Sequence, residues 1–428
     1  MKRTLIKNLV NEINNEVLIK GWVHRIRKLS KISFIILRDR TGLIQCIINN
    51  ALLIKEIKLE SVIEVIGTTV PSNNKISNME VQVNNINILS DVEYELPIEI
   101  NKSNLDINLD TMLNHRSISL RNEKINSIFK IQGLISQGFR EFLIKNDFTE
   151  IFSPKLVSEG AEGGTAIFKV NYFEKDAYLA QSPQFYKQIM VGSGYERVFE
   201  IAHVYRAEEH NTSRHLNEYV SMDLEMGFIK DELELMCLER NLLEYIMLKL
   251  QNEAADLLKL LEISLPNIKT TIPSMSFSEV INILETKYNK KCEDGDLDPE
   301  SEKLIGKYAS DVLQSDFIFI TDYPRKKRPM YTMPKNEIFT HSFDLLFRGL
   351  EITTGGQRIN NYNMLKENII YKNLNPNNFE NYLDVFKYGM PPHGGLAIGL
   401  ERLTCQLLNL KNIREASLFP RDRTRLLP

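Results

Sequence analysis

Cysteine is scarce in this sequence, and the few cysteines present are scattered. The 428 residues contain four, Cys46, Cys237, Cys292 and Cys405, and no two of them form a CxxC pair. This pattern argues against a zinc knuckle and against a disulfide framework. A reducing cytoplasm is therefore the expected compartment.

Long apolar runs are also missing. No run approaches the roughly 18 apolar residues that a membrane-spanning helix needs. The amino-terminal residues MKRTLI do not open the long apolar stretch of a secretory signal. We therefore expect no membrane partner.

Excess charge of either sign is absent too. Lys and Arg number 53 and Asp and Glu number 56, so the net charge is −3 at pH 7. A histone-like polycation is excluded, although a local basic patch would still allow nucleic-acid binding. Hydrophobic residues make up 43% of the chain. A chain of this length and composition can fold into two or three domains with substantial cores.

Residues 1–100 predict a small β-barrel. Short segments rich in β-branched residues alternate with turn residues, and a short helix is expected over residues 52–60. Five strands with a helix after the third are typical of an OB-fold, a frequent oligonucleotide binder. The expected strands are residues 17–23, 33–38, 43–48, 61–69 and 79–89.

The rest of the chain predicts an α+β domain over residues 125–428, after a hinge at residues 101–124. Helices interrupt hairpin-like strands without regular βαβ alternation, which favours an antiparallel sheet. Asp231, with Glu234 three positions later, is typical of a helix start. The expected segments are a helix at 125–146, strands over 151–228, a helix at 231–261, a weakly patterned insert at 264–330, and a helix at 361–374.

Two segments carry charged residues in patterns that are typical of catalytic or ligand-binding sites. In a strand, Arg206 and Glu208 point to the same face, and an antiparallel partner strand would add Asp223. Farther along, a glycine-flanked apolar strand runs into a helix and places Arg402 in its first turn. A guanidinium beside helix N–H groups suits a phosphate. From the charges alone, the first segment could also be an exposed, salt-bridged hairpin. Arg402 in the second segment could also be an ordinary surface arginine.

Both segments resemble signatures of the class II aminoacyl-tRNA synthetases. Residues 205–208 (YRAE) are similar to the second signature of that family and residues 399–403 (GLERL) to the third. The helix at 125–146, the strand after it and Pro154 resemble the first, which in the family builds a homodimer interface. Residues 206–218 and 419–423 are similar to archaeal-type aspartyl enzymes. The resemblance implies that ATP and L-aspartate form aspartyl-adenylate, from which aspartate passes to the 3′ end of tRNA(Asp).

The resemblance also assigns residues to ATP and Mg²⁺. Arg206 would hold the α-phosphate and Arg402 the γ-phosphate, and these two are the expected catalytic residues. The implied Mg²⁺ ligands are Asp344, Glu351 and Thr354, with two solvated strand acids as the alternative. The full set expected around ATP is Arg206, Glu208, Arg214, His215, Leu216, Glu351, Gly399 and Arg402.

Selection of aspartate over asparagine requires a charged site. The two side chains are nearly isosteric, so a buried cation left unpaired by the amide would separate them. In the aspartyl enzymes a lysine and an arginine matching Lys187 and Arg358 clamp the carboxylate, and asparaginyl enzymes have no lysine at the first position. A surface lysine is the alternative. The residues expected around aspartate are Glu162, Gln184, Lys187, Asp223, Thr354, Arg358 and His393.

The amino-terminal barrel carries the expected tRNA contacts. Residues 20–40 hold seven basic side chains against one acid, a local charge of +6, which suits a phosphate backbone. In the family a phenylalanine matching Phe34 stacks on the central anticodon base, and the position of Gln45 reads that base. For Phe34 alone, the barrel core is the alternative. A histidine at the position of His24 is typical of archaeal enzymes that also charge tRNA(Asn), and an amidotransferase partner would then convert the product.

Three other functions remain open from the sequence. An asparaginyl enzyme is disfavoured by Lys187. A non-catalytic RNA-binding paralogue is disfavoured because both Arg206 and Arg402 are present. A tRNA-independent ligase that makes asparagine would not need residues 1–100.

Overall fold

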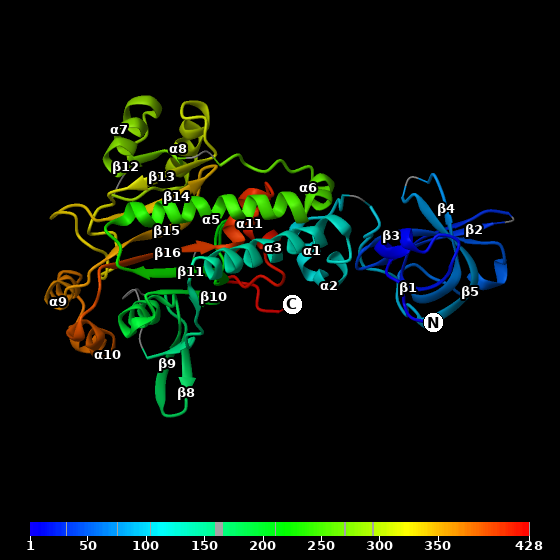
Figure 1. Ribbon diagram of the computed structural model, residues 1–428, viewed down its shortest axis with the longest axis horizontal. Coiled ribbons are helices and arrows are strands. Elements are labelled where there is room, and N and C mark those ends of the chain that lie inside the picture. Colours follow the sequence, from blue (N-terminus) through cyan, green and yellow to red (C-terminus); the bar gives the residue numbers. More distant parts are fainter. Residues whose placement is uncertain are drawn as a thin grey trace. The chain divides into compact units, whose positions relative to one another are not determined.

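The chain forms two compact units, Met1–Asp106 and Ile107–Pro428. The expected hinge at 101–124 is divided between them, and its second part contains the short helices α1 (Leu109–Asn114) and α2 (Arg116–Ser119). No helix in the described ranges has the length and apolar composition to span a bilayer. The computed structural model (Figure 1) describes residues 1–30, 32–74, 76–102, 104–158, 166–209, 211–268, 271–292 and 295–427.

The first unit is a closed five-stranded barrel, which confirms the predicted OB-fold. Its strand order is β1-β2-β3-β5-β4, and alternate residues such as Ile35 and Leu37 fill the interior. The predicted helix at 52–60 is wrong in extent, because only the turn η2 (Ala51–Ile54) is helical. The remaining elements are η1 (Ile6–Asn11), β1 (Glu16–Lys28), β2 (Ser33–Asp39), β3 (Gly42–Ile48), β4 (Val62–Pro71) and β5 (Met79–Ser90).

The second unit is built on an eight-stranded sheet in the order β12-β13-β14-β15-β16-β11-β10-β6. The six strands from β13 to β10 are antiparallel to their neighbours, and only the two edge strands pair in parallel. This confirms the predicted α+β class. The strands are β6 (Thr149–Glu150), β10 (Arg197–Tyr205), β11 (Glu218–Gly227), β12 (Ser274–Ser276), β13 (Phe317–Thr321), β14 (Ser342–Phe347), β15 (Leu350–Arg358) and β16 (His393–Gly399).

Three helices bury one face of this sheet. The helices α3 (Glu123–Lys145) and α5 (Glu232–Glu253) lie side by side across it, with α11 (Leu400–Leu407) against α3 (Figure 1). Asp231 caps α5 as predicted, because its side chain accepts a hydrogen bond from the backbone N of Leu233. On β11, Met222 and Leu224 join the core under these helices. The intervening residues of β11 therefore face the opposite side of the sheet.

Smaller elements complete the second unit. They are a three-stranded sheet and several short helices. The small sheet consists of β7 (Leu156–Val157), β9 (Lys175–Leu179) and β8 (Lys169–Tyr172). The short helices are α4 (Gln184–Met190), η3 (Val191–Tyr195), α6 (Ala255–Leu261), α9 (Tyr362–Tyr371), η4 (Pro376–Phe379), α10 (Glu380–Leu383), η5 (Asp384–Tyr388) and η6 (Ile413–Ala416).

The insert at 264–330 is a structural part of the second unit. Its strands β12 and β13 extend the main sheet, and its helices α7 (Phe277–Tyr288) and α8 (Pro299–Asp311) pack against them. Gly306 of α8 touches the β14–β15 turn at Gly349, so closely that a Cβ on Gly306 would lie 2.3 Å from the backbone N of Gly349. The absence of a side chain at Gly306 therefore sets the distance between the insert and the sheet.

The close approach at Gly306 predicts opposite effects for two glycine substitutions. Gly306→Ala should lower the free energy of unfolding by about 1–3 kcal/mol, because backbone must move to admit the methyl group. Gly133→Ala, in α3 with no atom within 4 Å of the new Cβ, should raise it by about 0.5–1 kcal/mol, because alanine is the better helix former. Denaturant unfolding of both variants measures the difference. Equal stabilisation by both would show that the contact at Gly306 is not tight.

Candidate active site

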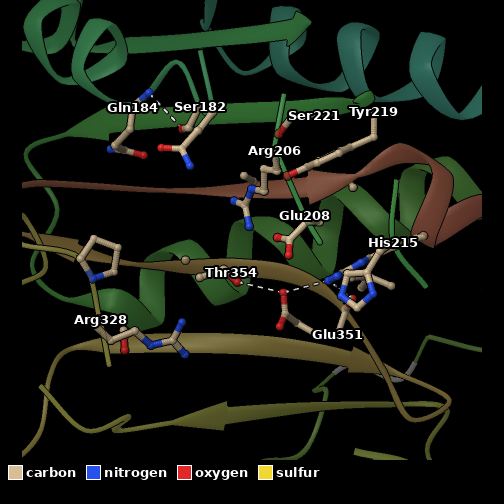
Figure 2. Close-up of a pocket in the computed structure, with 18 of the residues that line it drawn as sticks. Ser182, Gln184, Arg206, Glu208, His215, Tyr219, Ser221, Arg328, Glu351 and Thr354 are labelled. Atoms are coloured by element: carbon tan, nitrogen blue, oxygen red, sulfur yellow. Dashed lines mark hydrogen bonds and ion pairs between the residues drawn. The ribbon is translucent and has the colours of Figure 1, made fainter. Parts of the chain in front are cut away.

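A cavity of about 420 Å³ lies on the open face of the catalytic sheet. Its walls come from β11, β15 and β16, from the loop after β10, from α4 and from the start of α11. Figure 2 shows several of these side chains around the same space. The cavity brings together eleven of the predicted site residues: Gln184, Arg206, Glu208, Arg214, His215, Leu216, Glu351, Thr354, Arg358, Gly399 and Arg402.

Arg402 is fixed at the cavity by a carboxylate of the neighbouring strand. Gly399 ends β16 and α11 begins at the next residue, so Arg402 lies in the first turn of that helix, as predicted. Its Nη1 donates to the backbone O of Glu351 at 3.1 Å and to the Oε1 of Glu351 at 3.2 Å. Thr354 donates to the same Oε1 at 3.2 Å (Figure 2). Glu351 therefore presents its carboxylate to a cation and a hydroxyl at once.

Arg206 lies at the other side of the cavity, directly after β10. The backbone N of Arg206 donates to the O of Asn217 at 2.9 Å, and Asn217 donates back to the O of Arg206 at 3.0 Å. These bonds close the β10–β11 hairpin. The Arg206 guanidinium carbon lies 5.9 Å from the ring centre of Tyr219. Arg206 and Arg402, almost two hundred residues apart in the sequence, thus line one cavity.

The loop between β10 and β11 is anchored from the carboxyl end of the chain. Arg414 donates to the O of Thr212 at 3.0 Å and to the side chain of Asn211. Thr212 in turn lies 2.7 Å from the Nδ1 of His215. The loop residues predicted to contact ATP are therefore held by a network within the protein.

The three predicted metal ligands lie on two adjacent strands. Asp344 of β14 faces Thr354 of β15 directly in the strand register. Arg328 donates to Asp344 at 2.7 Å. Burial, together with the charge of Glu351, raises the pKa of Asp344 to about 6, although Arg328 opposes this. No group of three His, Cys, Asp or Glu in the described ranges could hold a metal ion.

Lys187 is completely buried behind the cavity. It lies on α4, whose start is fixed by a hydrogen bond from the Gln184 backbone N to the Ser182 Oγ at 3.1 Å. The Lys187 Nζ is 2.8 Å from Asp223 and 3.5 Å from Glu225. The surface-lysine alternative is therefore wrong.

Arg358 extends the same charge cluster to the cavity wall. Its Nε donates to Glu225 at 3.0 Å and its Nη2 to the O of Gly395 at 2.9 Å. Gln184 donates to the same Glu225 at 3.1 Å. Buried Glu225 thus joins Arg358, Gln184 and Lys187, and the charges of Arg358 and Lys187 lower its pKa against the effect of burial. The sequence analysis assigned no role to Glu225.

His393 and Glu162 are two further residues that were predicted around aspartate. His393 is buried, with its Nε2 3.0 Å from Gln188 and its Nδ1 2.9 Å from the O of Pro391, and the described lining residues do not include it. Burial lowers the pKa of His393 to about 4, so the ring is neutral at pH 7. Glu162 lies outside the described residues.

Several lining residues were missed by the sequence analysis. Arg328 and Tyr331 enter from the end of the insert and the segment after it, where no periodic pattern marks them. Tyr219 and Ser221 alternate with the core residues of β11, and this alternation was the available signal. The missed residues of the wall include Ser182, Tyr219, Ser221, Arg328, Tyr331, Ser342 and Glu401.

The predicted anticodon residues lie in the first unit. Phe34 of β2 is partly buried and outside the described core cluster, while its neighbour Ile35 is fully buried. Gln45 of β3 donates to Glu80 at 3.1 Å. The β1–β2 pairing has a bulge at His24, and such a bulge redirects a side chain.

His24 is held as a neutral ring. Its Nδ1 lies 3.2 Å from Arg38, which pairs with Glu60 at 2.7 Å. Burial and the nearby charge of Arg38 lower the pKa of His24 to about 4. The imidazole is therefore uncharged at pH 7 and offers hydrogen bonds without a formal charge.

Comparisons with known proteins agree with this architecture. The family model "tRNA synthetases class II (D, K and N)" matches residues 108–423, and the model "OB-fold nucleic acid binding domain" matches residues 17–89. The aspartate–tRNA(Asp/Asn) ligase of Thermus thermophilus is 48% identical over 100% of both chains. The aspartate–tRNA(Asp) ligase of Pyrococcus furiosus is 41% identical, also over 100% of both.

A solved structure extends the similarity to the whole fold. The asparaginyl-tRNA synthetase of Pyrococcus horikoshii, complexed with asparaginyl-adenylate, has a TM-score of 0.93 at 28% identity, with 100% of each chain covered. These matches confirm the resemblance that the two arginine motifs predicted. The chain belongs to the class II tRNA synthetases of the D, K and N group, enzymes that use ATP to ligate an amino acid to tRNA.

Proposed function

We propose that the chain is an aspartate–tRNA ligase that activates L-aspartate with ATP and charges both tRNA(Asp) and tRNA(Asn). The observation that carries this proposal is the meeting of Arg206 and Arg402 at one cavity, with the Lys187–Arg358 cluster at its inner wall. A cavity with cations at both sides suits a folded triphosphate and a carboxylate. Full-length similarity to aspartate–tRNA ligases supports the choice of amino acid.

In the proposed reaction the enzyme positions two anions and stabilises charge. The aspartate carboxylate oxygen attacks the α-phosphorus of ATP, and pyrophosphate leaves. Arg206 neutralises charge that grows on the α-phosphate, and Arg402 holds the γ-phosphate of the bent triphosphate. Glu208 and His215 contact adenine and the phosphates from the β10–β11 loop. The 3′-hydroxyl of the terminal tRNA ribose then attacks the activated carbonyl, the ester bond forms, and AMP leaves.

Glu351 at the cavity and the buried Asp344 on the adjacent strand are suited to Mg²⁺. Glu351 and Thr354 already share a hydrogen bond, and the pKa of Asp344 is raised by burial and by the charge of Glu351. A divalent ion held by these residues would relieve that repulsion, since Mg²⁺ is usually bound through one or two carboxylates. We propose Asp344, Glu351 and Thr354 as the residues that hold it. The ion supplies neutralisation of charge on the phosphates.

Selection of aspartate depends, in this proposal, on the buried cluster. Lys187 and Arg358 are cations, and Asp223 and Glu225 are their built-in counter-ions. Arg358 reaches the cavity wall, so a substrate carboxylate can share it with Glu225. The side chain of asparagine carries no charge to pair with these cations. Its amide NH2 group is a hydrogen-bond donor and would face other donors, those of Lys187 and Arg358. Gln184 and Asp223 orient the clamp, and Thr354 closes the site on the β15 side.

The cluster predicts that removal of the Lys187 charge abolishes aspartate activation. Lys187→Leu should lower kcat/KM for aspartate in ATP–pyrophosphate exchange by about 100-fold or more, because one cation of the clamp is lost and Asp223 is left unpaired. Lys187→Gln keeps a hydrogen-bond donor and covers the case in which the leucine variant does not fold. Exchange rates with aspartate and with asparagine are measured side by side.

A matched control distinguishes the loss of the aspartate clamp from the loss of any other buried ion pair. Lys249 on α5 is buried and pairs with Glu141 at 3.0 Å and Glu253 at 2.8 Å, outside the described cavity wall. Lys249→Leu should leave aspartate exchange within about threefold of the wild-type rate. Retained activity in both Lys187 variants would refute the clamp. Wild-type exchange with asparagine and not aspartate would show an asparaginyl enzyme.

The tRNA side of the proposal rests on the barrel. Phe34 would stack on the central anticodon base, and Gln45 would read that base. The neutral ring of His24 at the β1 bulge would accept either of the third anticodon bases that distinguish tRNA(Asp) from tRNA(Asn). The Thermus thermophilus relative bears the name aspartate–tRNA(Asp/Asn) ligase, which supports relaxed charging here.

Relaxed charging predicts aspartylation of both tRNAs. Purified tRNA(Asp) and tRNA(Asn) transcripts, charged separately with aspartate, should both be substrates. His24→Trp should lower charging of tRNA(Asn) about tenfold relative to tRNA(Asp), because the larger ring leaves less room for the second base. Aspartate exchange without tRNA should not change in this variant. Charging of tRNA(Asp) alone by the wild type would refute relaxed specificity.

The remaining parts of the proposal concern partners. A homodimer would form through α3 and the strand after it, where the first family signature lies. An amidotransferase would convert Asp-tRNA(Asn) to Asn-tRNA(Asn). The four cysteines, all described, are unpaired, which suits the reducing cytoplasm in which we propose that the enzyme works.

A further inference from the structure

Arg214 of the β10–β11 loop is held by a residue of the insert. Its Nη2 donates to the Oε2 of Glu302, on the first turn of α8. Both side chains are largely buried. Arg214 lines the cavity, whereas Glu302 lies behind it. The Nη1 of Arg214 is buried and has no hydrogen-bond partner among the described residues.

Glu302 also bonds the strand that carries the opposite side of the site. Its Oε2 accepts a hydrogen bond from the backbone N of Glu351 at 3.1 Å. Glu351 is the residue that holds Arg402. One carboxylate oxygen therefore connects the loop arginine to the strand β15 that positions the second phosphate-binding arginine.

The packing of α8 explains why Glu302 reaches this place. At Gly306, one turn further along α8, the helix backbone touches Gly349 of the β14–β15 turn. A Cβ on Gly349 would in turn lie 2.9 Å from the Cα of Lys303 and 3.1 Å from the backbone O of Glu302. The first half of α8 therefore packs against the β14–β15 turn, just before Glu351. This packing brings the Glu302 side chain within hydrogen-bonding distance of Arg214 and of the Glu351 backbone.

We propose that Glu302 is a positioning residue for ATP, which acts by holding the Arg214 guanidinium so that its free edge meets the triphosphate. This inference rests on the proposed function, because it takes ATP to occupy the cavity. One edge of the guanidinium is fixed by Glu302, and the unpartnered Nη1 is left for a phosphate oxygen. Fixing the flexible arginine before ATP binds removes part of the ordering cost of binding. The insert, far from being peripheral, thereby completes the ATP site.

The test uses the full-length enzyme in ATP–pyrophosphate exchange with aspartate. Glu302→Gln keeps an oxygen that can accept from the Glu351 backbone, so it removes the charge and little else. It should raise KM for ATP about tenfold, since a hydrogen bond to a charged group is weakened, and leave KM for aspartate within about twofold. The melting temperature is recorded for each variant. If the glutamine variant does not fold, Glu302→Asp replaces it, with the same expectation.

Two further variants show whether Glu302 acts through Arg214. Arg214→Ala should also raise KM for ATP, and the double variant Arg214→Ala/Glu302→Gln should match Arg214→Ala alone. Glu300→Gln is the control, because Glu300 lies on the same turn of α8 but is exposed and pairs with Lys290; its KM values should equal those of the wild type.

Three results would overturn the inference. An unchanged or lowered KM for ATP in Glu302→Gln would show that Glu302 does not support ATP binding. Equal changes in KM for ATP and for aspartate would indicate a purely structural role. If the fold-increases in KM for ATP of the two single variants multiply in the double variant, Glu302 does not act through Arg214. A wild-type enzyme inactive with aspartate would instead refute the proposed function itself, and the two failures are thereby told apart.

Discussion

Pairing of buried cations with carboxylates is the constraint on which this structure depends. A site for two anionic substrates needs several cations, yet an unpaired buried charge is costly. The protein meets both demands for five cations in or behind the cavity by giving each of them a carboxylate from a neighbouring element. The pairs are Lys187–Asp223, Arg358–Glu225, Arg402–Glu351, Arg214–Glu302 and Arg328–Asp344.

These pairs explain why the sheet order matters for function. The carboxylates lie on β11, β14, β15 and α8, and the cations lie on α4, α11, the β10–β11 loop, the end of the insert and the end of β15. Each ion pair therefore joins two different elements, and the antiparallel register of β15, β16 and β11 brings them to one face. A substrate anion that enters the cavity competes with built-in carboxylates, so binding reflects a difference between two ion pairs and not the strength of one.

The insert shows how a weak sequence signal can hide a structural part. Its helices have capped starts, at Ser276 and Asp298, but its strands are only three and five residues long. Such short strands contain too few alternating apolar and polar residues to predict which strand they pair with. The packing of Gly306 against Gly349 depends on the distance between two backbones, and no local pattern encodes that distance.

The sequence by itself determined the classes of the two units and named the candidate ATP residues that line one cavity. Alternation in β1–β5 predicted the barrel, and the arginine motifs identified the catalytic unit, because both depend on residues close together in the chain. Tertiary structure decided what lies behind the cavity. It placed Glu225 between Lys187 and Arg358, put His393 in a buried contact with Gln188, and brought Glu302 to Arg214. These contacts join residues tens to hundreds of positions apart, and only the strand register and helix packing bring such residues together.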